Sequence, residues 1–300
     1  MREHLVKDLR LLWRVLCSDA RTTAEPPHQT DELLKAVFQR TTDAASQVLG
    51  EMCSSAAGAE AGGTDAPPRI PALELIASPI VPEPEVTLGV RVRQRVCAGS
   101  VLAFYPGRIF PLTEKNLPRS NMLFSNEYEG VSMDGAGWYP QCWRGNRLLA
   151  DLPKTTLWHG NPLAVGNLLN HPPGGALPNV VPMAFRWPTW QELGQATPAH
   201  WARFVPHVVV EGGQVVRTAS GERSEPTAVQ NRSGEEGRGA SSEKVWFPPW
   251  PHMGMALISV RPVEPGEELF WNYRLHPRSD SGEATVQYPP WYTPVDDAEL

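Results

Sequence analysis

Proline is the residue that most restricts what this chain can fold into. The 300 residues include 31 Pro and 25 Gly. Proline has no backbone N–H to donate, and it is excluded from helix interiors and central strands. Hydrophobic residues make up 41% of the chain, which is enough for a packed core. The composition therefore predicts a loop-rich fold of short strands and disfavours a helical bundle or a doubly wound sheet.

The first 55 residues differ from the rest of the chain in having helical periodicity. Apolar residues recur every three or four positions over residues 1–17, and again from Thr30-Asp31 onward. We therefore expect an amphipathic docking helix at the start, and a second helix that runs to about Met52. Residues 56–71 are rich in Ala, Gly and Pro and are expected to form a flexible linker.

Residues 72–276 are predicted to form the main domain, which is a β-rich α+β fold. Its short apolar runs, punctuated by Pro and Gly, predict a short helix within 158–170 and strands at 86–92, 101–105, 131–133 and 255–260. Residues 212–244 have almost no large apolar side chains, so we expect a disordered insertion there. Residues 277–300 form a tail rich in Pro and aromatic residues.

Charge, cysteine spacing and hydropathy restrict the partners and the compartment. The formal net charge of -6 gives no basic surface for phosphate backbones, so we expect no direct nucleic-acid partner. The four cysteines (Cys17, Cys53, Cys97 and Cys142) are far apart, which predicts free thiols and no metal site. No apolar run approaches the roughly 20 residues that span a bilayer, and no secretory signal is evident. We expect an intracellular protein without membrane association; nucleus, cytoplasm and organelle stay open, as does the oligomeric state.

Four segments of the main domain contain motifs that also occur, in this order, in one enzyme family. They are residues 88–92 with 96–102, residues 131–135, residues 161–171 with 178–180, and residues 260–273. The most specific motif is the end of the last segment, Gly266-Glu267-Glu268-Leu269-Phe270-Trp271-Asn272-Tyr273. Over residues 85–275 the chain resembles the SET-domain family of protein lysine methyltransferases. Within that family it is most similar to the subgroup typified by SET domain-containing protein 9.

The resemblance implies both a fold and a cofactor. The fold is SET-type, with short strands and a knot-like crossing, preceded here by the helical N-terminal region. The cofactor is S-adenosyl-L-methionine. Gly89 and Val90 would lie against it, because a glycine lets the backbone approach a ligand closely. Asn170 and His171 would hold its adenine and amino-acid ends.

The reaction that the resemblance implies is methyl transfer to a lysine side chain of a protein substrate. Tyr273 stands where the family has its catalytic tyrosine, so its hydroxyl would lie beside the methyl group and the amine, in contact with the cofactor. Phe270 and Trp271 would line the substrate channel. The bulky indole of Trp271 would crowd that channel and favour monomethylation, although an ordinary core position explains this tryptophan equally well. No metal is required.

Two other interpretations are compatible with the sequence. Thr87 replaces one glycine of the family's first motif, and Pro172-Pro173 replace a Ser-Cys pair, with a longer gap after them. These departures suit a catalytically inactive SET-like module that binds peptide or cofactor. A loop-rich interaction scaffold without a cofactor site is the third interpretation. In the tail, Tyr288, Trp291 and Tyr292 are candidates for a lid over the channel; the alternative is a loose tail.

Overall fold

The computed structural model describes part of the chain. The described residues are 2–17, 25–61, 70–78, 80, 87–111, 123–126, 131–135, 143–144, 147–148, 161–189, 191–194, 204–205, 208–211, 214–218, 253–275, 288 and 292–295. Half of the predicted linker, most of the predicted insertion, and Cys142 and Trp291 lie outside these ranges.

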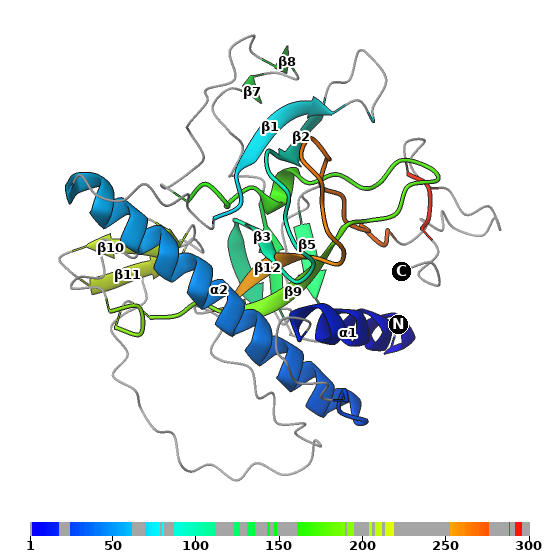
Figure 1. Cartoon of the computed structure of the whole chain (residues 1–300), viewed down its shortest axis with the longest axis horizontal. Helices are drawn as coiled ribbons and strands as arrows, with labels where there is room; N and C mark the ends of the chain where they lie inside the picture. Colours follow the sequence, from blue (N-terminus) through cyan, green and yellow to red (C-terminus); the bar gives the residue numbers. More distant parts are fainter. Residues whose placement is uncertain are drawn as a thin grey trace.

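Two helices form the N-terminal part, α1 (Arg2–Leu16) and α2 (Thr30–Ala61). Their apolar stripes meet, so Leu9 and Leu12 of α1 and Val37 of α2 are at most 1% exposed. Figure 1 shows α2 lying diagonally across the sheet that contains β9, with α1 beneath the same region. Helix α2 extends into residues 56–61, which we expected to be linker, because alanine and glutamate there favour helix despite Gly58.

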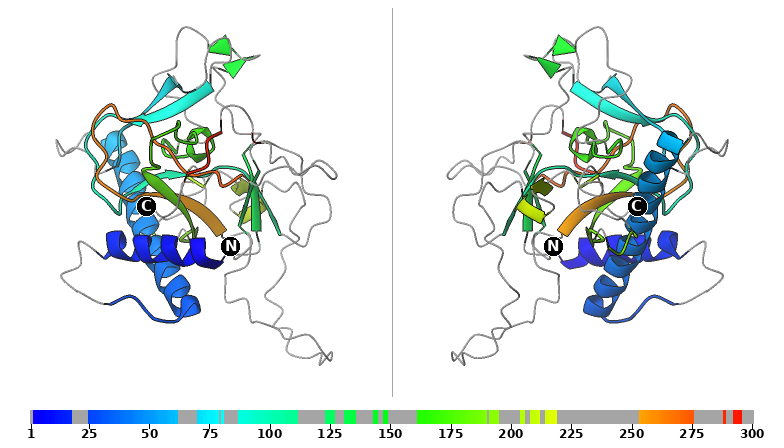
Figure 2. Two further views of the ribbon diagram at one scale, coloured as in Figure 1. Left: turned by 90° about the vertical axis from the view of Figure 1, so that its right-hand side faces the viewer. Right: turned by 90° about the vertical axis from the view of Figure 1, so that its left-hand side faces the viewer.

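Within the described residues, the strands form five small antiparallel sheets. The central sheet has the order β3 (Val101–Phe104), β12 (Met253–Ser259) and β9 (Val180–Arg186). All seven residues of β12 are buried, as expected for the middle strand. Figures 1 and 2 show α2 packed along one side of this sheet. The sheet and the helices share one core, which includes Phe104, Phe185 and Leu257.

The other four sheets are small. β1 (Leu73–Ser78) pairs with β2 (Thr87–Val92), and β6 (Val131–Asp134) lies between β4 (Arg108–Pro111) and β5 (Leu123–Asn126). β10 (Val208–Glu211) pairs with β11 (Gln214–Thr218), and β7 (Trp143–Arg144) with β8 (Arg147–Leu148). The described chain is thus a mixed α/β structure of small antiparallel sheets with few helices, in line with the proline content.

Two local predictions are wrong. Within 161–170 the chain forms only a 3₁₀ turn (Gly166–Leu168) in place of the expected helix. The reason is that this segment lies against β3: Phe104 N–H donates to Leu163 O at 2.7 Å, and a Cβ on Gly166 would come within 2.9 Å of Phe104 O. Strand β11 lies inside the expected insertion, where Val215 and Val216 allow pairing with β10.

Strand β9 escaped the sequence prediction because Pro182 interrupts its apolar run. The strand lies at one edge of the central sheet, where the missing N–H of a proline is tolerated. Among the residues described, no helix combines the length and hydrophobicity needed to cross a membrane. Within the same residues, no group of His, Cys, Asp or Glu is placed to hold a metal ion.

Candidate active site

The Gly266–Tyr273 segment begins at a tight turn and continues as a partner of β2. Gly266 has a φ of +86°, a left-handed conformation that glycine adopts readily. Its N–H donates to Val92 O at 2.8 Å, and Leu269 N–H donates to Val90 O at 2.7 Å. Leu269 is fully buried. The hydrophobic residue of the motif therefore anchors the segment in the core, next to the hairpin in which Gly89 lies.

After Leu269 the segment leaves β2 and lies beside residues 170 and 179–180. Asn170 and Phe270 form a parallel bridge, and Trp271 N–H donates to Asn170 O at 3.0 Å. Phe270 O accepts N–H bonds from Asn179 at 3.0 Å and Val180 at 3.1 Å. The third and fourth sequence motifs, about 100 residues apart, are therefore in direct backbone contact.

Asn179 is fully buried and fixes this contact with its side chain. Its Nδ2 donates to Glu268 O at 2.8 Å and to Glu267 Oε1 at 3.2 Å. Its Oδ1 accepts the N–H of Phe270 at 2.8 Å. One amide side chain therefore satisfies the backbone on both sides of Leu269, where the segment passes from one partner to the other.

Tyr273 points its hydroxyl at the chain just before Asn170. The hydroxyl donates to Leu169 O at 2.8 Å, and Trp271 Nε1 donates to the same carbonyl at 3.1 Å. The Trp271 and Tyr273 rings meet edge to face, with centroids 5.2 Å apart. The proton of the Tyr273 hydroxyl is therefore committed to Leu169 O.

His171 is held in one tautomer by its two neighbours. Tyr273 N–H donates to its Nδ1 at 3.3 Å, so Nδ1 carries no proton, and Nε2 donates to Thr293 O at 2.7 Å. Burial is the main cause that lowers the pKa of His171 below 6.5, against the opposing effect of its backbone hydrogen bonds. The imidazole is therefore neutral near pH 7 and connects Tyr273 with the tail.

The tail segment 292–295 covers His171. The Tyr292 ring is buried and stacks on the imidazole at 4.3 Å, and its hydroxyl accepts Leu275 N–H at 3.2 Å. Of the three lid candidates, Tyr292 thus covers the site, Tyr288 touches Tyr292 with ring centroids 5.1 Å apart, and Trp291 lies outside the described residues.

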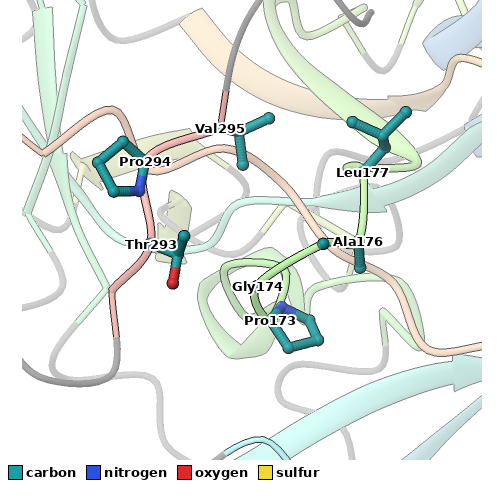
Figure 3. Close-up of a pocket in the computed structure, with 8 residues that line it drawn as sticks. Pro173, Gly174, Ala176, Leu177, Thr293, Pro294 and Val295 are labelled. Atoms are coloured by element: carbon teal, nitrogen blue, oxygen red, sulfur yellow. The ribbon is translucent and has the colours of Figure 1, made fainter.

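A small cavity of about 170 Å³ lies between this tail and the loop after His171. Figure 3 shows Thr293, Pro294 and Val295 facing Pro173 to Leu177 across it. The loop turns sharply because Ala176 N–H donates to Pro173 O at 2.9 Å, with Gly175 at a φ of +82°. The Pro-Pro departure from the family motif thus leads into a turn that lies opposite the tail.

Glu268 and Asn170 fill the space next to Gly89. The Glu268 side chain is buried, and a Cβ at position 89 would overlap its carboxylate. Asn170 Nδ2 donates to Glu268 Oε1 at 3.0 Å and to Leu88 O at 2.9 Å. Burial raises the pKa of Glu268, although hydrogen bonds from Asn170 and Ser78 oppose the shift. A side chain at position 89 would therefore force the Glu268 carboxyl group to move.

The structure brings the sequence-predicted residues into one neighbourhood. Gly89 lies against the Glu268 carboxyl group. The Val90 carbonyl accepts the N–H of Leu269, and the Val90 side chain is buried in the core. Asn170 forms a parallel β-bridge with Phe270. Tyr273 contacts His171 through its ring and its backbone N–H, and it contacts Trp271 through its ring. The second motif joins through Gly135, whose carbonyl accepts from Asn167 Nδ2 at 3.2 Å.

Three contributors were not among the predicted site residues: Asn179, Glu268 and the Asp8–Arg274 ion pair. Asn179 and Glu268 stand inside quoted motifs, so motif membership could have identified them. Tyr292 was predicted only as one of three lid candidates in the Pro-rich tail. Nothing in the sequence connects Asp8 to Arg274, because 266 positions separate them.

Comparisons with known proteins add little to this geometry. No protein family model matches the chain, and no curated protein does. A similar solved structure is the "crystal structure of KRYPTONITE in complex with mCHH DNA, H3(1-15) peptide and SAH", with 12% sequence identity and a TM-score of 0.32. The match covers 72% of this chain and 26% of that one, so this chain spans about a quarter of its length. A TM-score this low does not establish a shared fold.

Proposed function

We propose that this chain is a SET-type protein lysine methyltransferase that uses S-adenosyl-L-methionine, with Tyr273 as the active-site tyrosine. The observation that carries the proposal is the position of the Tyr273 hydroxyl. It donates to Leu169 O at 2.8 Å, directly before the Asn170-His171 pair that contacts residues 270–273. Two motifs that resemble the family separately are thereby joined at the tyrosine that the family uses. The narrower resemblance, to the subgroup of SET domain-containing protein 9, stays a prediction from sequence.

The chemistry requires a neutral lysine nitrogen held in line with a methyl group. Free lysine has a pKa of about 10.4, so nearly all of it is ammonium at neutral pH, and a desolvated channel favours the neutral amine. Alignment of the two reactants contributes roughly 7–11 kcal/mol in favourable cases. In the proposal Tyr273 serves this task with its phenol oxygen, which is held in position by the hydrogen bond that the hydroxyl donates to Leu169 O.

The charge of the residues on the cofactor side suits S-adenosyl-L-methionine. The side chains of Asn170 and His171 on this side form hydrogen bonds within the protein. The cofactor supplies an activated methyl group on a positive sulfonium, and the buried carboxyl of Glu268 suits a nearby cation. Both hydrogens of Asn170 Nδ2 and both ring nitrogens of His171 are bonded to protein groups. In this proposal Asn170 and His171 therefore hold the cofactor through their backbone, while their side chains brace the crossing segments.

The Trp271 ring is buried beside Tyr273 and Tyr105, the latter with ring centroids 6.3 Å apart. In the proposal it forms one wall of the lysine channel and restricts the product to monomethyl-lysine. Phe270 is only partly buried and would extend the same wall.

A second candidate function is a SET-like module that binds a peptide or the cofactor without turnover. The observation that favours it is the commitment of the Asn170 and His171 side chains to protein groups, together with Glu268 against Gly89. Tyr292 stacked over His171 also leaves this side of the site covered by the tail.

Two measurements separate the candidates. Calorimetric titration of the full chain with S-adenosyl-L-methionine tests cofactor binding, and absence of binding removes the enzyme proposal. Transfer of radiolabelled methyl groups to lysine peptide arrays and cell lysate then tests turnover, with Tyr273→Phe as the variant. The enzyme proposal expects labelling by the natural chain and at least about a hundredfold less by the variant. Binding without any transfer supports the second candidate, and equal labelling by both proteins removes Tyr273 from the chemistry.

A further inference from the structure

The residue that follows Tyr273 is tied to the N-terminal helix. Arg274 makes a two-pronged ion pair with Asp8 of α1: Nη1 lies 2.6 Å from Oδ2, and Nη2 lies 2.8 Å from Oδ1. The Asp8 side chain is 13% exposed and that of Arg274 is 36% exposed. Paired, planar contacts of this kind fix orientation as well as distance. In Figure 1 the segment after β12 passes next to α1, where this pair forms.

The backbone at Arg274 is in an uncommon conformation. Its φ is +48°, and among the described residues it is the one non-glycine residue with positive φ. Such a conformation persists only where surrounding contacts determine it. Arg274 N–H also donates to Asn272 Oδ1 at 3.0 Å, which closes the turn from the other side. The ion pair and this bond therefore hold the chain reversal directly after Tyr273.

The same turn connects to the lid. Leu275 N–H donates to the Tyr292 hydroxyl at 3.2 Å, and Tyr292 stacks on His171 at 4.3 Å. His171 in turn accepts the N–H of Tyr273. A displacement of Arg274 would therefore reach Tyr273 along the backbone and again through Tyr292 and His171.

Helix α1 is held in place independently of the ion pair. Leu9 and Leu12 are buried against the core, and Val15 O lies so close to Gly99 that a side chain there would overlap it. Neutralising Asp8 should therefore leave α1 docked and the chain folded. This separates the effect of the ion pair from the effect of losing the helix.

We propose that Asp8 is a positioning residue for the active site, and that α1 orients Tyr273 through the Asp8–Arg274 pair. The catalytic consequence rests on the function proposed above, whereas the orienting role is a property of the fold and is tested separately. In this arrangement the N-terminal helix is a part of the catalytic unit.

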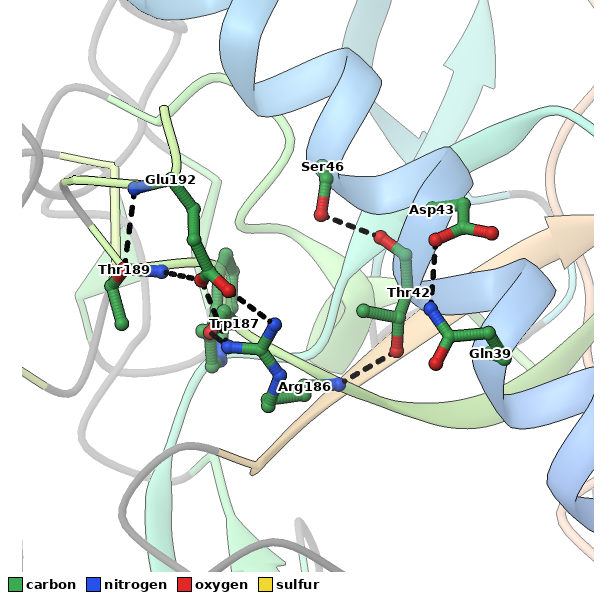
Figure 4. A network of polar contacts seen from close by, with 8 residues as sticks. All are labelled: Gln39, Thr42, Asp43, Ser46, Arg186, Trp187, Thr189 and Glu192. Atoms are coloured by element: carbon green, nitrogen blue, oxygen red, sulfur yellow. Dashed lines mark hydrogen bonds and ion pairs between the residues drawn. The ribbon is translucent and has the colours of Figure 1, made fainter. Parts of the chain in front are cut away.

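The test compares three full-length proteins: the natural chain, Asp8→Asn and the control Glu192→Gln. Asp8→Asn keeps the side-chain shape and removes its charge. The control breaks a similar pair elsewhere, in which Arg186 Nη1 and Nη2 lie 2.9 and 2.8 Å from the Glu192 carboxylate. Figure 4 shows that pair beside Thr189 and near α2, where Arg186 N–H donates to Thr42 Oγ1 at 3.1 Å. Both variants weaken an ion pair between an arginine and a carboxylate, and the carboxylate side chain is 13% exposed at Asp8 and 47% exposed at Glu192.

Hydrogen exchange over residues 270–275 is the first readout. We expect at least about fivefold faster exchange there in Asp8→Asn and unchanged exchange in Glu192→Gln. The exchanged pair, Asp8→Arg with Arg274→Asp, should restore slow exchange. Equal exchange in Asp8→Asn and the natural chain overturns the proposal, and so does an equal increase in the control.

Steady-state methyl transfer is the second readout. We expect Asp8→Asn to lower kcat by about tenfold, with KM for the peptide and the unfolding midpoint little changed, because misorientation costs rate more than binding. A fall in kcat that only follows a loss of folded protein overturns the catalytic part. If the natural chain itself transfers no methyl group, the proposed enzyme function fails, and hydrogen exchange alone then decides the orienting role.

Discussion

Replacement of Asn179 by alanine should destabilise the chain more than any other single polar-to-alanine change near the site. The side chain is fully buried and makes three hydrogen bonds, to Glu268 O, Glu267 Oε1 and Phe270 N. Alanine leaves Glu268 O and Phe270 N–H without these partners in a region with little access to water. A buried polar group left unsatisfied costs about 1–3 kcal/mol, so we expect a loss of about 4 kcal/mol in the free energy of unfolding.

That loss is a large share of the roughly 5–15 kcal/mol by which small domains are stable, so it should be visible in urea unfolding followed by tryptophan fluorescence. The matched control is Asn161→Ala. Asn161 is also fully buried, and its side chain donates to Phe204 O at 2.6 Å and accepts from Leu163 N–H at 2.8 Å. Both variants should lose stability, but only Asn179→Ala should lose hydrogen-exchange protection selectively over residues 266–273.

A second substitution separates the donor from the acceptor. Asn179→Asp keeps an oxygen for Phe270 N–H but turns a carboxylate toward Glu268 O and the Glu267 carboxylate. The variant should be at least as unstable as Asn179→Ala at neutral pH and should recover stability on acidification, when the new carboxyl is protonated and can donate. A loss below about 1 kcal/mol for Asn179→Ala, or equal protection of 266–273 in both alanine variants, would refute the reasoning.

Three further outcomes follow from the same geometry. Tyr273→Phe should lower the free energy of unfolding by only about 1 kcal/mol, because Leu169 O keeps its bond from Trp271 Nε1. Methyl transfer should fall by at least about a hundredfold. Urea unfolding measures the first effect and radiolabel transfer the second. The folded-state pKa of His171 lies below the 6.5 of an unperturbed histidine. The contribution of His171 to stability is therefore present above pH 6.5 and is lost as the pH falls through the folded-state pKa. Unfolding at a series of pH values should show this loss in the natural chain and not in His171→Asn. The folded-state pKa of Glu268 is raised above 4.5, so its stabilising contribution is lost as the pH rises through that pKa. Glu268→Gln should therefore be no less stable than the natural chain at pH 7. A large destabilisation of this variant at pH 7 would contradict burial as the main cause of the raised pKa.

The sequence predicts the strands that are formed by short apolar runs. It does not predict the local structure of a segment whose conformation depends on a tertiary contact. Strands β2, β3, β6 and β12 lie where short apolar runs predict them, because each run has a buried face to fill. The apolar residues of 161–170 also have helical spacing. The segment nevertheless lies along β3, where Leu163 O accepts the N–H of Phe104. Periodicity describes which residues are buried and does not state which neighbour buries them.

The site shows the same division at the level of single residues. The motif predicts Leu269 as a core residue, and Leu269 is buried. Glu268 is not readable as buried, because a glutamate beside a turn is normally solvated. It is buried here because Gly89 provides room, and Asn170 and Ser78 provide hydrogen bonds, from three separate parts of the chain. Such a requirement is visible only once those parts are placed together.

The positions at which the chain departs from the resembled motif, Pro172 and Pro173, are also explained by contacts between distant parts of the chain. Pro172 and Pro173 remove two N–H donors from the chain after His171 and lead into the turn at Gly175. That turn lies opposite Thr293, whose carbonyl accepts the proton of His171 Nε2. The proline pair and the tail are therefore two halves of one local arrangement around the imidazole, so a tail deletion should disturb His171 and Tyr273 before it disturbs the central sheet. The same coupling explains why a tail that looks loose in sequence contributes a buried tyrosine, Tyr292, to the candidate site.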